Sequence, residues 1–203
     1  MAGLQKTIRI LIADDVSQFR DSVKDLLEDE NNITVVGEAA DGQDAVEMAG
    51  RLKPEVVLMD VQLPRMDGIA ATRLIKKECP QTNVLVISGL DDKAYIIDAV
   101  RAGANGYISK NRPAAELVSA IKTFMSEGFI IPQPVMGILI QGLGRPDAPG
   151  RDNAPRCLTT EEMLVMGLLC RGDSAREIAD ILKCGIDTVR ARLSSIFQKL
   201  PVA

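Results

Sequence analysis

Histidine is absent from this chain of 203 residues, and tryptophan is absent as well. Without histidine the chain cannot build a Ser/His/Asp triad, a Cys/His nucleophile pair or the usual zinc site of mixed Cys and His ligands. Its four cysteines show no CxxC spacing, so isolated thiols are expected rather than a metal site. Aromatic residues make up only 3% of the chain, and aliphatic side chains must therefore form its core.

Long apolar runs and strong positive charge are lacking too. The longest apolar stretch, near Ile138–Ile140, is too short to span a bilayer, and the N-terminus has no signal-peptide pattern. We therefore expect a cytoplasmic protein without membrane contact. Residues 1–128 hold 15 Lys and Arg against 20 Asp and Glu, and residues 156–203 hold seven against six. A strong nucleic-acid footprint would show more positive charge than this.

The first 128 residues alternate short apolar runs with amphipathic stretches. The predicted strands are Ile8–Ala13, Ile33–Ala39, Val56–Met59, Val84–Ile87 and Gly106–Ser109. Between them apolar residues recur at helical spacing, as in Phe19, Val23 and Leu27. Five strands alternating with five helices predict an α/β domain with a doubly wound, five-stranded parallel sheet.

The remaining residues divide into a linker and a small helical domain. Pro, Gly and Asp are frequent in Gly144–Arg156, which indicates a linker over residues 129–157, with a short helix at Val135–Leu143. Helical patterns then fill residues 158–203. Two capping boxes are predicted there, Thr159 with Glu162 and Ser174 with Glu177. These patterns predict a separate all-α domain.

Acidic, hydroxyl and lysine side chains stand where predicted strands end. They are Asp14, Asp15, Asp60, Ser88 and Lys110. Because the carboxyl ends of parallel strands open onto one edge, where such folds bind ligands, we expect these side chains to share a pocket. Three carboxylates would repel one another unless a divalent cation joined them, and Mg²⁺ prefers oxygen ligands. With a lysine to offset phosphoryl charge, the pattern predicts a phosphate-accepting site.

This constellation resembles the receiver domain of bacterial two-component response regulators. The similarity rests on the Asp14–Asp15 pair, the run Val57–Asp60, the segment Leu63–Gly68, Ser88 and Lys110. It covers residues 1–128 and implies the flavodoxin-like topology of CheY. It also implies a sensor histidine kinase as partner, with its phosphohistidine as the phosphoryl donor.

The resemblance implies a role for each matching residue. Asp60 is the implied phosphoacceptor, and Lys110 and Ser88 would bind the phosphoryl oxygens. Tyr107 stands at the aromatic switch position. The implied ligands of the Mg²⁺ cofactor are Asp14, Asp15, Asp60 and the backbone carbonyl of Gln62. On phosphorylation, Ser88 would move toward the phosphoryl group and vacate space for the Tyr107 ring.

Residues 158–203 resemble the LuxR-type helix-turn-helix of the NarL/FixJ branch. The similarity rests on Leu158–Thr159, Glu177–Ala179, Thr188–Val189 and Ile196–Phe197. It implies a dimer that binds double-stranded DNA to regulate transcription, with a recognition helix in the major groove. The candidate DNA contacts are Ser174, Arg176, Thr188, Arg190 and Arg192. In part of this family the unphosphorylated receiver covers the recognition helix, so we expect it to cover the Arg190 face here in the unphosphorylated state.

One departure from the family keeps an alternative open. Asp187 occupies a position that is usually Lys, and a carboxylate there would face the polyanion. The alternative is a signalling adaptor or phosphate sink whose C-terminal domain binds protein rather than DNA. An output enzyme is not expected, because residues 156–203 contain no histidine and no nucleophile–base pair. The only expected reactions are self-phosphorylation from a phosphodonor and autodephosphorylation.

Overall fold

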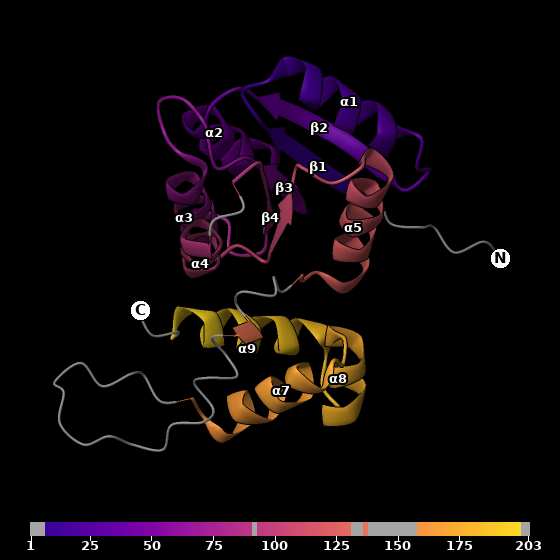
Figure 1. Cartoon of the computed structure of the whole chain (residues 1–203), viewed down its shortest axis with the longest axis vertical. Helices are drawn as coiled ribbons and strands as arrows, with labels where there is room; N and C mark the ends of the chain where they lie inside the picture. The colour runs from indigo at the N-terminus through magenta and orange to yellow at the C-terminus, as the bar shows by residue number, and fades with distance from the viewer. Residues whose placement is uncertain (1–6, 91–92, 131–135, 138–157, 200–203) are drawn as a thin grey trace, which may run out of the picture.

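The computed structural model describes residues 7–90, 93–130, 136–137 and 158–199. Figure 1 shows two parts, a domain built on a sheet and a smaller helical domain. The predicted linker lies mostly outside the described residues, as does the predicted helix Val135–Leu143 apart from Met136 and Gly137, which are helical. Phe129 and Ile130, which the sequence places at the start of the linker, are packed against the rest of the protein.

The sheet has five parallel strands in the order β2-β1-β3-β4-β5. They are β1 (Ile8–Ala13), β2 (Ile33–Ala39), β3 (Val56–Met59), β4 (Asn83–Ser88) and β5 (Gly106–Ser109). The predicted parallel α/β fold is confirmed, and β4 is one residue longer at each end than expected. This is the flavodoxin-like strand order, whose reversal point lies between β1 and β3. Asp14 and Asp60 follow these two strands directly.

Five helices cover the two faces of the sheet. They are α1 (Ser17–Glu28), α2 (Gly42–Leu52), α3 (Gly68–Glu78), α4 (Lys93–Arg101) and α5 (Ala114–Glu127). Apolar residues of α1 and α5 pack on one face of the sheet, and those of α2, α3 and α4 pack on the other. Consecutive strand residues alternate between the two cores, which fits the period of two in a strand.

The helical domain contains α7 (Thr160–Arg171), α8 (Ala175–Leu182) and α9 (Ile186–Gln198). Both predicted capping boxes are confirmed: Thr159 and Glu162 bond each other's backbone N–H groups at the start of α7, and Ser174 and Glu177 do so at the start of α8. These bonds satisfy backbone donors that lack helical partners. In the described part of the chain, no helix is both long and apolar enough to cross a membrane.

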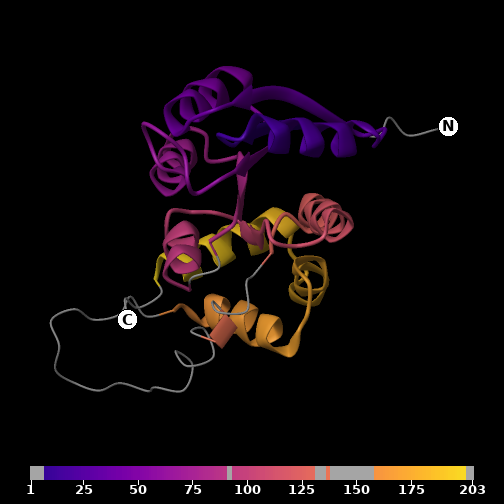
Figure 2. The same cartoon turned by 45° about the horizontal axis from the view of Figure 1, so that its top comes forward.

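The apolar core on the face of the sheet covered by α2, α3 and α4 continues into the helical domain. Helix α9 packs against α4 of the sheet domain, and both views show it between the sheet domain and α7 (Figures 1 and 2). The rings of Phe129 and Phe197 stack with centroids 5.1 Å apart. Apolar side chains of α9, including Val189 and Leu193, belong to the same buried cluster as those of α2, α3 and α4. The helical domain is therefore docked on the sheet domain.

Candidate functional site

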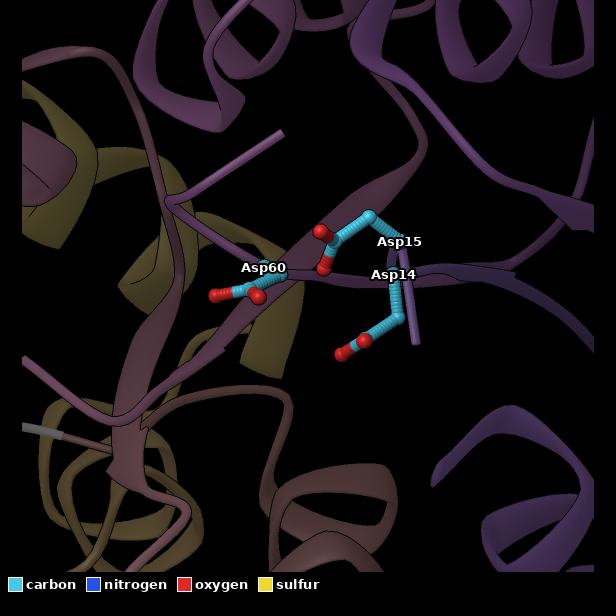
Figure 3. A group of neighbouring side chains, drawn as sticks. All are labelled: Asp14, Asp15 and Asp60. Carbon is cyan, nitrogen blue, oxygen red and sulfur yellow. The ribbon is translucent and has the colours of Figure 1, made fainter. Parts of the chain in front are cut away.

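Three carboxylates converge at the carboxyl edge of the sheet, as the sequence predicts (Figure 3). Asp14 and Asp15 follow β1, and Asp60 follows β3. Each offers an oxygen within 4.8 Å of an oxygen of the other two. Asp14 and Asp60 are buried, whereas Asp15 is exposed, so the cluster opens to solvent on one side.

Lys110 completes this cluster from the end of β5. Its Nζ lies 2.5 Å from Asp14 Oδ2 and 2.7 Å from Asp60 Oδ2. Its backbone N–H donates to the Ser88 carbonyl at 2.8 Å, which fixes the loop that follows β5 against the end of β4. The lysine is thus held directly beside the carboxylate expected to accept phosphate.

Burial and charge act in opposite directions on these groups. Burial raises the pKa of the Asp14 carboxyl above its ordinary value, although hydrogen bonds from Lys110 and the Val16 N–H oppose the change. Burial also works against the charged form of Lys110, but hydrogen bonds to Asp14 and Asp60 outweigh it and raise the pKa of the ammonium. Lys110 therefore remains a cation at neutral pH.

The loop after β3 is shaped closely around Asp60. The backbone N–H of Gln62 donates to Asp60 Oδ1 at 3.4 Å. Gly68 begins α3 so close to Asp60 that a Cβ there would collide with the Asp60 carbonyl oxygen. Asp67 caps α3 by accepting from the Ala70 N–H at 2.8 Å. These contacts hold the Gln62 backbone next to the carboxylate cluster, where its carbonyl is the predicted metal ligand.

Ser88 and Tyr107 meet at the loop that follows β4. The Ser88 side chain is fully buried, and its Oγ accepts from the Leu90 N–H at 3.3 Å. The Tyr107 hydroxyl donates to the Leu90 carbonyl, and the residue is 6% exposed. The Tyr107 ring is therefore already directed inward in this structure, whereas the family resemblance implies that it fills space that Ser88 vacates. Both side chains hold the same loop.

Helix α1 contributes two residues that the sequence does not assign to the site. The Phe19 ring lies under Lys110, with Nζ 4.5 Å from the ring centroid. Arg20 donates from Nη1 to the Asp14 carbonyl at 2.6 Å and from Nε to Glu38 at 3.4 Å. The apolar spacing of α1 predicts that Phe19 faces the core. Nothing in the sequence around Arg20 indicates that this arginine contacts Asp14 at the site.

The candidate DNA contacts lie on or before α8 and α9. Ser174 is engaged in the α8 capping box, and Thr188 is exposed near the start of α9. Arg192 donates to Glu161 of α7 at 2.6 Å. The structure thus places Thr188 where it could reach a ligand, while Ser174 and Arg192 have partners within the helical domain.

The two other candidate arginines contact the C-terminal end of α5 in the sheet domain. Arg190 donates from Nε to the Glu127 carbonyl at 3.2 Å, and its Nη1 lies 3.0 Å from Asp187 Oδ1. Arg176 donates to the Ser126 carbonyl at 3.1 Å, and its Nε lies 3.8 Å from Glu127 Oε1. The expected cover over the Arg190 face is therefore present. Because these partners are far apart in the sequence, no local pattern predicts Ser126 and Glu127.

Comparison with known proteins identifies both domains. Residues 10–122 match the model of the response regulator receiver domain, and residues 156–203 match that of bacterial regulatory proteins of the luxR family. The chain belongs to the two-component response regulators. Its receiver is the sheet domain, and its helical domain is the LuxR-type helix-turn-helix of a NarL/FixJ-type regulator.

Individual relatives resemble the regulator over much of its length. Response regulator protein VraR of Staphylococcus aureus is 34% identical over 197 residues, which are 97% of this chain and 91% of that protein. A LuxR-family two-component response regulator from Aurantimonas is 30% identical with a TM-score of 0.60, covering 69% of this chain and all of that one. Salmonella typhimurium RcsB, 24% identical, covers 98% of this chain and 94% of its own with a TM-score of 0.58, a likeness in fold alone.

These matches support a phosphorylation-controlled transcription regulator, and they do not favour the adaptor or phosphate-sink alternative. The receiver family implies a histidine kinase partner, and the helix-turn-helix family implies DNA binding. Receiver domains generally bind Mg²⁺ at an acidic cluster, and such a cluster is present in this regulator.

Proposed function

We propose that Asp60 accepts a phosphoryl group from the phosphohistidine of a sensor histidine kinase, and that this event controls DNA binding through the docked helix α9. The observation that carries the proposal is the convergence of Asp14, Asp15 and Asp60 with Lys110 at one edge of the sheet. A carboxylate in contact with a lysine ammonium, in a pocket open on one side, can attack an electrophilic phosphorus atom.

The donor set fits Mg²⁺. Three carboxylates within one ligand sphere supply the oxygen ligands that this cation prefers, and Asp15 leaves the cluster open for water and substrate oxygens. We assign its binding to Asp14, Asp15, Asp60 and the Gln62 backbone carbonyl. When bound, Mg²⁺ offsets negative charge on the phosphoryl oxygens during transfer.

In the transfer step, an Asp60 carboxylate oxygen forms a bond to phosphorus as the bond between phosphorus and the kinase imidazole nitrogen breaks. Lys110, 2.7 Å from Asp60 Oδ2, donates a hydrogen bond to a phosphoryl oxygen as charge develops there. The Ser88 hydroxyl donates to a second phosphoryl oxygen. That movement ends its acceptance from the Leu90 N–H and so alters the loop that Tyr107 also holds.

The consequence for DNA binding follows from the contact between α5 and α9. While Arg190 donates from Nε to the Glu127 carbonyl and from Nη1 to Asp187, its side chain is only 22% exposed, so little of its guanidinium is left for a DNA phosphate or base. Helix α4 follows the loop held by Ser88 and Tyr107, and α4 packs on α9. A phosphoryl group adds about −1.5 to −2 charge. We infer that a rearranged loop shifts α4 and weakens its contact with α9.

The released regulator would bind double-stranded DNA as a homodimer in the cytoplasm. Its only reactions would be its own phosphorylation and dephosphorylation, so it would not be an enzyme with an external substrate. A symmetric dimer predicts an operator with two related half-sites.

Phosphorylation is tested by incubating the full chain with acetyl phosphate and Mg²⁺ and measuring intact mass. The native chain should gain one phosphoryl group, and Asp60→Asn should gain none. Asp21→Asn, an exposed carboxylate on α1, is the matched control and should behave as the native chain does. A phosphoryl group found on Asp60→Asn would contradict the assignment.

Regulation is tested by incubating the regulator with fragmented genomic DNA, with and without beryllofluoride and Mg²⁺, and sequencing the retained fragments. A two-fold-related motif enriched only with beryllofluoride would support the proposal. Equal enrichment in both states, or none from folded protein, would contradict phosphorylation-gated DNA binding.

A further inference from the structure

Phosphorylation of Asp60 would affect the three contacts of Lys110 differently. The ammonium touches two carboxylates, Asp14 and Asp60, and the face of the Phe19 ring. Under the proposed function, Asp60 loses its negative charge when it forms the acyl phosphate, and Asp14 is shared with the metal. Of the three groups that contact Lys110, only the Phe19 ring keeps the same charge distribution throughout the reaction and takes no new partner.

The first turn of α1 fixes the ring in this place. The Val16 N–H donates to Asp14 Oδ1 at 3.0 Å, and Arg20 Nη1 donates to the Asp14 carbonyl at 2.6 Å. The start of the helix is thus bonded to both the side chain and the backbone of the same acidic residue. Phe19 lies between these two bonds in the sequence and packs on the core formed by α1, α5 and the sheet. It also lines the small cavity beside Asp14 and Asp60.

We propose that Phe19 is a positioning residue for phosphoryl transfer, and that its ring face keeps the Lys110 ammonium directed at the phosphoryl oxygens while the carboxylates change partners. A cation–π contact requires the ammonium to stay over the ring face, within about 6 Å of the centroid, whichever of its N–H bonds points at the ring. The lysine can therefore turn from Asp60 toward the phosphoryl group without losing this contact. The inference rests on Asp60 being the phosphoacceptor.

A series of fluorinated phenylalanines at position 19 tests the electrostatic part of this contact. Ring fluorination weakens the negative face while changing shape little. We would incorporate phenylalanine with one, two and three ring fluorines into the full chain and measure the phosphorylation rate with acetyl phosphate and Mg²⁺ by intact mass. The rate should fall stepwise with each fluorine, because a smaller share of molecules then holds the ammonium in place, and the total fall should not exceed roughly thirtyfold, the fold-change that corresponds to a full cation–π contact.

The same series at Phe124 is the control, because that ring is fully buried in α5 and belongs to the same core as α1. Its phosphorylation rate should not follow the fluorine count. Phe19→Leu should lower the rate as the trifluorinated ring does, and Phe19→Trp should retain it because indole offers the strongest face for a cation. Thermal unfolding of each variant verifies that the chain is folded.

The outcomes separate the two hypotheses. A stepwise fall at position 19 alone supports the inference. A flat series at position 19, or equal falls at both positions, would overturn it, even if Phe19→Leu slows the reaction through packing. If the native chain itself gains no phosphoryl group at Asp60, the proposed function fails, and the inference fails with it.

Discussion

Arg190 on α9 donates its Nε hydrogen to the backbone carbonyl of Glu127, 63 positions earlier in the chain. That carbonyl belongs to the last turn of α5, where carbonyl groups lack helical partners and carry the negative end of the helix dipole. The Glu127 carboxylate adds charge of the same sign beside Arg176. This end of the receiver therefore offers two arginines the kind of acceptors that a DNA backbone would offer.

Reversing the charge of Glu127 should weaken the docking of Arg176 and Arg190 on the end of α5. We expect Glu127→Lys to raise the affinity of the regulator for double-stranded DNA by roughly two- to tenfold without a phosphodonor, because the new cation repels Arg176. Anisotropy of a labelled duplex at low salt measures it. Glu116→Lys makes the same charge change at the first turn of α5, where Glu116 lies beside Arg112. Equal gains in both variants would show that total charge alone is responsible.

Asp187 should oppose DNA binding in two ways. Its side chain is 91% exposed at the start of α9, and its carboxylate pairs with Arg190. With beryllofluoride and Mg²⁺ present, so that α9 is released from the receiver, Asp187→Lys should increase DNA affinity and steepen the dependence of log affinity on log salt by about two, one for the new lysine and one for Arg190. Glu47→Lys on the exposed surface of α2 controls for net charge. An unchanged salt slope would argue against either residue contacting phosphate.

The Tyr107 hydroxyl should contribute to the stability of the receiver. Tyr107→Phe removes the donor to the Leu90 carbonyl, which should lower the free energy of unfolding by about 1 kcal/mol. Urea unfolding followed by circular dichroism measures the change. Tyr95→Phe is the control, because Tyr95 is 43% exposed on α4, and it should change stability by less than about 0.5 kcal/mol. Equal losses in the two variants would contradict the role of the Leu90 bond.

Replacing Gly68 or Gly50 by alanine should change the stability of the receiver in opposite directions. Gly68→Ala forces the start of α3 away from the Asp60 carbonyl, so it should cost roughly 1–3 kcal/mol of stability and slow phosphorylation. Gly50 lies within α2, and a methyl group there would meet nothing within 4 Å, so Gly50→Ala should stabilise the receiver by about 0.5–1 kcal/mol. Urea unfolding and phosphorylation rates measure both, and a tolerated Gly68→Ala would contradict the close approach.

The helical domain should lose stability in acid through Glu162. Hydrogen bonds from Lys199, the Thr159 N–H and Ser195 outweigh burial and lower the pKa of the Glu162 carboxyl to about 2. A carboxyl with a lowered native pKa stabilises the fold above its unfolded pKa, near 4.5, and this contribution disappears as pH falls toward 2.

Glu162→Gln should therefore destabilise α7 by roughly 1–3 kcal/mol at pH 7, with the difference from the native chain shrinking below about pH 4. Hydrogen exchange of α7 peptides, read by mass spectrometry across this pH range, measures the local effect. Asp180→Asn, which changes an exposed carboxylate on α8, serves as the control. A difference that stays constant with pH would exclude titration of Glu162 as its cause.

Most of the receiver could be predicted from the sequence because its signals are local. Apolar runs define the strands, and polar residues directly after those runs define the pocket, since strand direction alone brings Asp14, Asp60 and Lys110 together. In the helical domain the capping boxes at Thr159 and Ser174 could be predicted as well, because each is formed by two residues three positions apart.

The contacts between distant segments could not be predicted in this way. Phe19 has the spacing of an ordinary core residue, and the sequence does not show that its ring lies under Lys110. The partners of Arg176 and Arg190 depend on how two domains dock, and their side chains are equally suited to DNA. Phe129 follows a helix-ending glycine and resembles the start of a linker until its stacking partner Phe197 is known.

If docking controls DNA binding as proposed, the stacked pair of Phe129 and Phe197 would set how readily the helical domain leaves the receiver. An aromatic pair contributes about 0.5–1.5 kcal/mol beyond its buried area, so its loss would multiply the undocked population by roughly two- to tenfold. Background activity in the absence of stimulus could thus be tuned over that range by residues that touch neither phosphate nor DNA. Sensitivity could then diverge between related bacteria while the chemistry at Asp60 stayed the same.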